Sequence, residues 1–167
     1  MGNGIRAGVL TISTKGAAGL RNDESGEAVR RMLEEKGFAV VRRHIISDQL
    51  QTIADTLMAW VDEDNLALIV TSGGTGLSPT DVTPQAMEKV IDYQVPGMAE
   101  AMRAESLKKT PHAMISRAMV GVRKNCLIIN LPGSPKGASE NLSVVLPALG
   151  HGLAKLGGDT SDCGSQS

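Results

Sequence analysis

The sequence has few aromatic residues and almost no net charge, and each shortage excludes a class of protein. One Phe, one Trp and one Tyr occur among 167 residues, too few for the stacked aromatic platform of proteins that bind single-stranded nucleic acid. Seventeen Lys and Arg residues stand against 18 Asp and Glu residues, which gives a formal net charge of -1. No overall positive field attracts nucleic acid or anionic lipid. We therefore expect no nucleic-acid partner, and any anion site must be local.

Long apolar runs and paired cysteines are also absent. No apolar run is longer than that of residues 66–70, far below the roughly 20 residues that span a bilayer. The first residues, MGNGIR, contain no apolar stretch of the length that a signal peptide requires. Cys126 and Cys163 fit neither a disulfide framework nor a metal-ligand spacing. We expect a cytoplasmic protein with no membrane association, in which both cysteines are bystanders.

Glycine is the residue in excess. The chain has 19 glycines among 167 residues, roughly 11% against an average usage near 7%, and this excess predicts tight backbone turns. The length fits one domain, and 41% hydrophobic residues with a mean hydropathy of -0.04 are typical of a globular protein. We predict a single domain over residues 1–156, followed by a polar, flexible tail over residues 157–167.

Hydrophobic patterning indicates the α/β class. Short apolar runs rich in β-branched residues predict buried strands at 7–12, 38–46, 66–71 and 126–131. Apolar residues at helical spacing predict helices between the first three strands, within 24–37 and 50–61. Alternation of this kind favours a mostly parallel sheet covered by helices on both faces.

The second half of the chain has weaker signals. Thr83 followed by Pro84 predicts a helix start after a loop over 72–82, and a further helix is expected over 97–108. Residues 111–125 are hard to assign, although 118–122 could form a short strand or hairpin. The last helix is expected to be interrupted by Pro147.

Two Gly-rich loops follow predicted strands, where ligands bind in parallel sheets. The first contains Gly73, Gly74, Thr75 and Gly76, whose backbone N–H groups can approach a phosphate closely. A tight turn is the simpler interpretation, but hydroxyls and a carboxylate suited to phosphate and Mg²⁺ follow directly, at Ser78, Thr80, Asp81 and Thr83. Pro79 stands where a dinucleotide-binding motif needs glycine, and the Gly-Lys-Ser/Thr of a P-loop is missing.

The second Gly-rich loop adds a cation. It contains Pro132, Gly133, Ser134 and Lys136 and also leads from a strand into a helix, so it predicts either a second anion site or a proline-stiffened turn. Asp48 ends the second strand and would share the sheet edge with Asp81. Its carboxylate suits either a helix cap or a metal contact, and the sequence does not separate these alternatives.

Four spaced motifs together resemble the MogA/MoaB family of molybdenum-cofactor biosynthesis. They are TSGGTGLSPTDVTP at 71–84, VPGMAEAMR at 95–103, Ile-Ser-Arg at 115–117 and NLPGSPKG at 130–137. The resemblance extends over about residues 5–156. It implies a three-layer α/β/α fold, usually trimeric, that transfers AMP from Mg-ATP to the terminal phosphate of molybdopterin and releases pyrophosphate. Hand-over of the product to a molybdenum-insertion protein would follow.

The resemblance also implies residue roles. Asp48 and Asp81 match the two aspartates that the family uses for catalysis and Mg²⁺ binding. The nucleotide and phosphate sites would comprise Gly73, Gly74, Thr75, Gly76, Pro132, Gly133, Ser134 and Lys136. Ser13 and Ser116 fall in segments that line the pterin pocket.

One departure from the family pattern leaves alternatives open. Many members end the first strand in Ser-Asp, whereas this chain has Ser13, Thr14 and Lys15. A MoaB-like trimer that binds molybdopterin or its precursor without adenylylating it is the main alternative. A nucleotide-processing enzyme related to CinA-type proteins, which act on nicotinamide nucleotides, is the second.

Overall fold

A six-stranded sheet forms the middle layer of the computed structural model, which describes residues 4–161. The strand order is β2-β1-β3-β6-β5-β4. The first four strands in this order are parallel, β5 is antiparallel to β6, and β4 is antiparallel to β5. The strands are β1 (Arg6–Ile12), β2 (Ala39–Ile46), β3 (Leu68–Ser72), β4 (Tyr93–Gln94), β5 (Val120–Arg123) and β6 (Cys126–Leu131). The predicted parallel sheet is confirmed.

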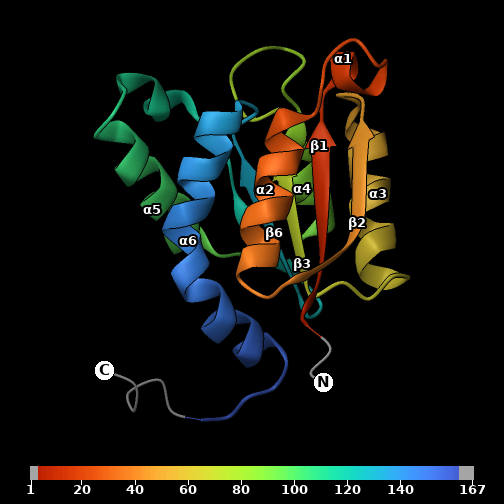
Figure 1. Cartoon of the computed structure of the whole chain (residues 1–167), viewed down its shortest axis with the longest axis vertical. Coiled ribbons are helices and arrows are strands. Elements are labelled where there is room, and N and C mark those ends of the chain that lie inside the picture. Colours follow the sequence, from red (N-terminus) through yellow and green to blue (C-terminus); the bar gives the residue numbers. More distant parts are fainter. Residues whose placement is uncertain (1–3, 162–167) are drawn as a thin grey trace.

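Helices cover both faces of this sheet (Figure 1). One face is covered by α2 (Glu24–Glu35) and α6 (Pro135–Leu156), with α5 (Pro96–Leu107) packed beside α6. The other face is covered by α3 (Leu50–Asp62) and α4 (Thr83–Val90). Two short helices, α1 (Thr14–Ala17) and the 3₁₀ helix η1 (Pro111–Ile115), lie in connections. The expected three-layer α/β/α fold is therefore present, and no described helix is long and apolar enough to cross a membrane.

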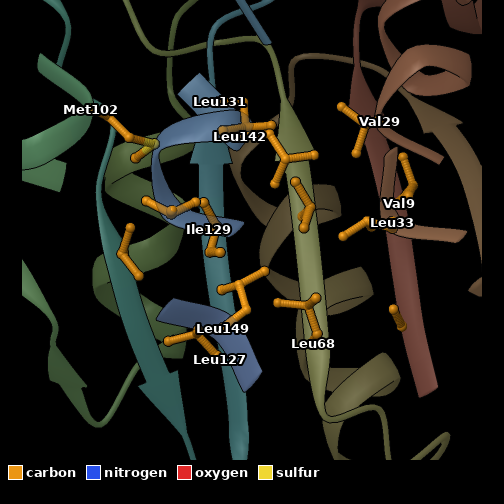
Figure 2. Close-up of a cluster of buried hydrophobic side chains, with 14 of the residues drawn as sticks. Val9, Val29, Leu33, Leu68, Met102, Leu127, Ile129, Leu131, Leu142 and Leu149 are labelled. Carbon is orange, nitrogen blue, oxygen red and sulfur yellow. The ribbon is translucent and has the colours of Figure 1, made fainter. Parts of the chain in front are cut away.

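The alternating side chains of each strand divide the core into two clusters, because successive residues of a strand face opposite sides of a sheet. On β1, Val9 joins the cluster under α2 and α6, whereas Leu10 joins the cluster under α3 and α4. Leu142 and Leu149 of α6 are completely buried against the first face and point toward the strands in Figure 2. Burial on both faces fixes the register of the parallel strands and hence the position of their carboxyl ends.

The last helix differs from its prediction. α6 runs through Pro147 without interruption, although proline removes one helical hydrogen bond. The proline is exposed, while Leu142 and Val145 before it and Leu149 and Leu153 after it are buried in one cluster. Packing on both sides of the proline therefore keeps the helix continuous, and the expected interruption is wrong.

Candidate active site

The carboxyl ends of β1, β2 and β3 carry the functional candidates. In Figure 1 the arrowheads of β1 and β2 point toward the end of the molecule where α1 and the loop between β3 and α4 lie. A cavity of about 700 Å³ opens here and is lined by residues from both Gly-rich loops, by α1 and by the start of α2. A smaller cavity of about 320 Å³ is lined by the two loops together with α5, η1 and α6. The predicted loops thus separate two neighbouring cavities.

Asp48 lines the larger cavity directly after β2. Its Oδ2 accepts hydrogen bonds from the backbone N–H of Thr14 at 2.8 Å and from the Thr14 hydroxyl at 2.9 Å. The Thr14 hydroxyl also accepts a bond from the Asp48 N–H at 3.1 Å. The N-cap of α3 is Gln49, which makes no side-chain cap bond. Asp48 therefore holds the start of α1 rather than capping α3, and the capping alternative is wrong.

Asp81 lines the same cavity from the loop that joins β3 to α4. Its Oδ2 accepts a bond from the Ser78 N–H at 3.1 Å, and its own N–H donates to the Ser78 carbonyl at 2.9 Å. A β-carbon added to Gly76 would lie 2.8 Å from the same carboxylate oxygen. Glycine at position 76 therefore leaves the room that this carboxylate occupies.

The glycines at the start of this loop are required by backbone geometry. Gly73 and Gly74 have φ angles of 104° and 68°, in the region that side chains other than glycine rarely adopt. A β-carbon at Gly73 would lie 2.2 Å from the Ile12 carbonyl oxygen. The loop therefore passes the end of β1 at a distance that only glycine allows, and Gly73 and Gly74 both line the cavity there.

The second loop begins α6. Ser134 is the N-cap of α6, and its hydroxyl accepts a bond from the Gly137 N–H at 3.1 Å. Ser134 lines both cavities, Gly133 lines the larger and Pro132 the smaller. The start of a helix suits an anion, because its first backbone N–H groups have no carbonyl partner within the helix. Lys136 is exposed and lines neither cavity.

The other predicted residues divide between the cavities. Gly73, Gly74 and Ser13 line the larger cavity with both aspartates. Thr75, Gly76 and Ser116 line the smaller one. The structure therefore separates Ser13 from Ser116, the two residues that the family resemblance assigned to one pterin pocket.

Sequence reasoning missed Arg21. The larger cavity is lined by Asp23, Glu24, Asp48 and Asp81 but by a single basic residue, Arg21. Among the described ion pairs, Asp23 binds Arg43 at 3.1 Å and none includes Arg21. Arg21 follows the short helix α1, which the sequence did not predict, and so no signal placed this cation at the cavity.

Arg117 was also missed as a site residue. Its guanidinium donates to the carbonyl oxygens of Gly76 at 2.8 Å and Asp81 at 2.7 Å, and its backbone N–H donates to the Thr75 carbonyl at 2.8 Å. These bonds hold both ends of the segment that carries Asp81. The Ile-Ser-Arg motif was the available signal, but the segment around it could not be assigned.

Most of the remaining candidates for chemistry are unreactive or lie outside both cavities. Burial raises the pKa of the Cys126 thiol to about 12, which keeps it protonated and unreactive at neutral pH. Cys163 lies outside the described residues. His44 and His151 line neither of the two cavities, whereas His112 lines the smaller one. Cys126 fits its expected role as a bystander.

Comparisons with known proteins agree with this geometry. A family model described as "Probable molybdopterin binding domain" matches residues 8–151. Molybdopterin adenylyltransferase of Helicobacter pylori strain J99 is 41% identical over 147 residues, which are 87% of this chain and 84% of that protein. The Escherichia coli K12 protein of the same name is 38% identical over 152 residues, 89% of this chain and 77% of that one.

Solved structures give the same relationship. MoaB from Thermus thermophilus superposes with a TM-score of 0.88 at 46% identity, covering 93% of this chain and 98% of that one. A CinA protein from Thermoplasma acidophilum has a TM-score of 0.67 at 19% identity, covering 89% of this chain and 99% of that one, which shows a shared fold alone. The chain belongs to the MogA/MoaB family of molybdopterin-binding domains.

Proposed function

We propose that this protein is a molybdopterin adenylyltransferase that transfers AMP from Mg-ATP to the terminal phosphate of molybdopterin. One observation carries the proposal: Asp48 and Asp81 line a single cavity of about 700 Å³ together with backbone from both Gly-rich loops. Phosphoryl and nucleotidyl transfer need anions brought together in line, with their charge neutralised. The relatives named molybdopterin adenylyltransferase, at 37–41% identity, support the same reaction.

The proposed reaction needs no strong base. An oxygen of the terminal phosphate of molybdopterin forms a bond to the α-phosphorus of ATP. The bond from that phosphorus to the bridging oxygen of the β-phosphate breaks, and its electron pair leaves with pyrophosphate. A phosphate monoester is already largely ionised near neutral pH, so the site needs to orient and neutralise rather than deprotonate. This requirement explains why neither cavity is lined by a Ser-His-Asp arrangement.

The residues fit a magnesium ion that arrives with ATP. Mg²⁺ is commonly bound by one or two carboxylates together with substrate phosphates and water. No group of three His, Cys, Asp or Glu side chains within residues 4–161 could hold a metal ion, whereas Asp48 and Asp81 supply two carboxylates at one cavity. When bound, the ion would withdraw charge from the phosphates. These two residues are the proposed ligands.

The chain's own groups would bind and orient the phosphates. The backbone of Gly74 and the start of α6 at Ser134 would donate N–H groups to phosphate oxygens, because both line the cavity and neither carries a bulky side chain. Gly73, whose N–H donates to the Leu131 carbonyl at 3.0 Å, would line the phosphate site without donating. Each well-placed donor contributes roughly 3 kcal/mol to transition-state stabilisation. Arg21, the basic residue of a largely acidic lining, would add positive charge next to the phosphates. We retain Thr75, Gly76, Pro132 and Lys136 as proposed nucleotide contacts, and Ser13 and Ser116 as proposed pterin contacts.

A direct assay tests the activity. Purified protein is incubated with Mg-ATP, with and without molybdopterin, and the release of pyrophosphate is measured. Molybdopterin-dependent release, with a product whose mass has increased by one AMP moiety, supports the transferase. Tight molybdopterin binding without pyrophosphate release favours the non-catalytic MoaB-like alternative.

That alternative rests on Thr14. The Asp48 carboxylate is already engaged by the Thr14 backbone and hydroxyl, in the segment where the chain departs from the common family pattern. In the non-catalytic alternative, Asp48 only holds the start of α1 and takes no part in AMP transfer.

Three further properties stay predictions. We expect a homotrimer, hand-over of the product to a molybdenum-insertion protein, and a cytoplasmic location. Residues 1–156 are proposed as one domain and residues 157–167 as a flexible tail, of which residues 162–167 lie outside the described structure.

A further inference from the structure

The loop that carries Asp81 has few attachments to the rest of the protein. Residues 77–80 are exposed, and the hydrogen bonds of Ser78, Thr80 and the Asp81 carboxylate stay within the loop. Among the described residues, the hydrogen bonds that join segment 76–81 to another part of the chain all come from Arg117. The described hydrogen bonds that tie this segment to the rest of the protein therefore all come from one distant side chain.

Arg117 suits this task by its shape. The planar guanidinium presents several N–H donors in a fixed fork. Nε donates to the Gly76 carbonyl at 2.8 Å and Nη2 to the Asp81 carbonyl at 2.7 Å, so the fork spans the segment from its first residue to its last. Nη1 donates to the Gln85 side chain at 3.2 Å. No carboxylate within residues 4–161 forms an ion pair with Arg117. All of its described acceptors are therefore neutral.

Arg117 is itself anchored to rigid elements. The residue after it, Ala118, accepts a bond from Arg103 of α5 at 2.7 Å. Met119 then accepts a bond from the backbone N–H of the buried Asn130 of β6 at 3.0 Å, and its own N–H donates to the Asn130 side-chain oxygen at 3.4 Å. The Asn130 amide in turn donates to the Thr71 hydroxyl on β3 at 3.1 Å. An exposed loop is thus clamped to the sheet and to α5 through a single guanidinium.

We propose that Arg117 is a positioning residue that fixes the Asp81 carboxylate in the larger cavity by clamping both ends of segment 76–81. It touches neither substrate in this account and acts through Asp81. The activity readout of this inference rests on the proposed adenylyltransferase function. A readout from the loop itself is independent of that function.

Arg117→Lys is the test variant, because lysine keeps the charge but loses the fork. Hydrogen–deuterium exchange followed by mass spectrometry should show at least about tenfold faster exchange in peptides covering 76–82, with peptides of β1 and β6 unchanged. Gln85→Ala is the matched control, since it removes only the Nη1 contact. It should leave the exchange of 76–82 within about twofold of the wild-type rate. Unchanged exchange in Arg117→Lys contradicts the proposal, whether or not the protein adenylylates molybdopterin.

Kinetics then separate positioning from a general structural role. A misplacement of about 1 Å costs roughly 100-fold in rate, so kcat of Arg117→Lys should fall about 10- to 100-fold, with each KM changed less than about threefold. In a background that already carries Asp81→Asn, Arg117→Lys should cost less than about twofold further. Independent, multiplicative losses contradict action through Asp81.

A wild-type measurement covers the case in which Arg117→Lys does not fold. The Nε–H of Arg117, bonded to the Gly76 carbonyl, should give a slowly exchanging NMR signal. Exchange as fast as that of Arg21, which makes no hydrogen bond among those described, contradicts the clamp.

Discussion

At the scale of single residues, the two aspartates differ in what already binds them. Asp48 accepts two hydrogen bonds from Thr14 through one oxygen, so its carboxylate supports α1 as well as the cavity. Asp81 accepts one backbone bond from Ser78 within its own loop. A change at Asp81 therefore tests chemistry with less effect on folding.

Asp81→Asn should lower kcat for AMP transfer by about 100-fold, the size of effect expected when one strong electrostatic contact in a transition state is lost. Asparagine keeps the shape and one acceptor oxygen, so the melting temperature should stay close to that of the wild type. Asp55→Asn is the matched control, since Asp55 is exposed on α3 and lines neither cavity. Full activity in Asp81→Asn would remove its catalytic role.

Arg21→Ala should raise the KM of at least one substrate by about tenfold, because a charge-assisted bond to phosphate contributes roughly 1.5–3 kcal/mol. Steady-state kinetics with ATP and molybdopterin varied in turn measure the effect. Lys89→Ala is the control, because this exposed lysine of α4 lines neither cavity and has no proposed role in binding. An unchanged KM for both substrates in Arg21→Ala would contradict the role of Arg21.

At the scale of elements, hydrophobic periodicity predicted the helices and strands that bury an apolar face. The strand predicted at 126–131 is β6 without change, and the helices predicted within 24–37 and 50–61 are α2 and α3. These elements bury a continuous apolar face, which leaves a clear pattern in the sequence. The two Gly-rich loops were placed correctly for the same reason, since each follows a buried strand.

The short helix α1 and the role of Arg117 follow from contacts that leave no periodic signal. α1 is only four residues long and is held by Asp48, 34 positions away in the sequence. The role of Arg117 depends on carbonyl groups 36 to 41 positions distant. Such long-range polar contacts cannot be read from a local pattern. Arg21 was missed because it follows α1, whose position depends on a contact of this kind.

Gly73→Ala should disrupt the first loop. The φ angle of 104° and the 2.2 Å approach of a β-carbon to the Ile12 carbonyl both oppose the substitution. We expect the free energy of unfolding to fall by more than about 2 kcal/mol, measured by urea denaturation. Gly97→Ala is the control, because open space surrounds that helical position in α5, and alanine there should be neutral or stabilising by up to about 1 kcal/mol. Equal stability of the two variants would contradict the strained geometry of the loop.

At the scale of the whole molecule, ion pairs connect α2 to the edge strand β2. Glu27 of α2 pairs with Arg30, Arg31 and, across to β2, Arg43. Hydrogen bonds from Arg30 and Arg31 lower the pKa of Glu27 from 4.5 to about 2. The ionised carboxylate is therefore favoured by the folded state.

The sign of the pH effect follows from this lowered pKa. The contribution of Glu27 to stability is fully present above about pH 4.5 and is lost as pH falls toward about 2. Glu27→Gln should be less stable than the wild type at pH 7, and the two melting temperatures should converge between pH 4.5 and 2. Added salt should also narrow the gap, because these groups are partly exposed to solvent. Glu35→Gln, on the same helix without a described ion pair, is the control. A gap that stays constant with pH would contradict the ion-pair account.

The central claim is that one cavity of this molecule joins AMP to molybdopterin, and pyrophosphate release from Mg-ATP tests it most directly. The account predicts release only when molybdopterin is present, together with a product heavier by one AMP moiety. Molybdopterin that binds tightly without any pyrophosphate release would contradict the account and leave a binding protein.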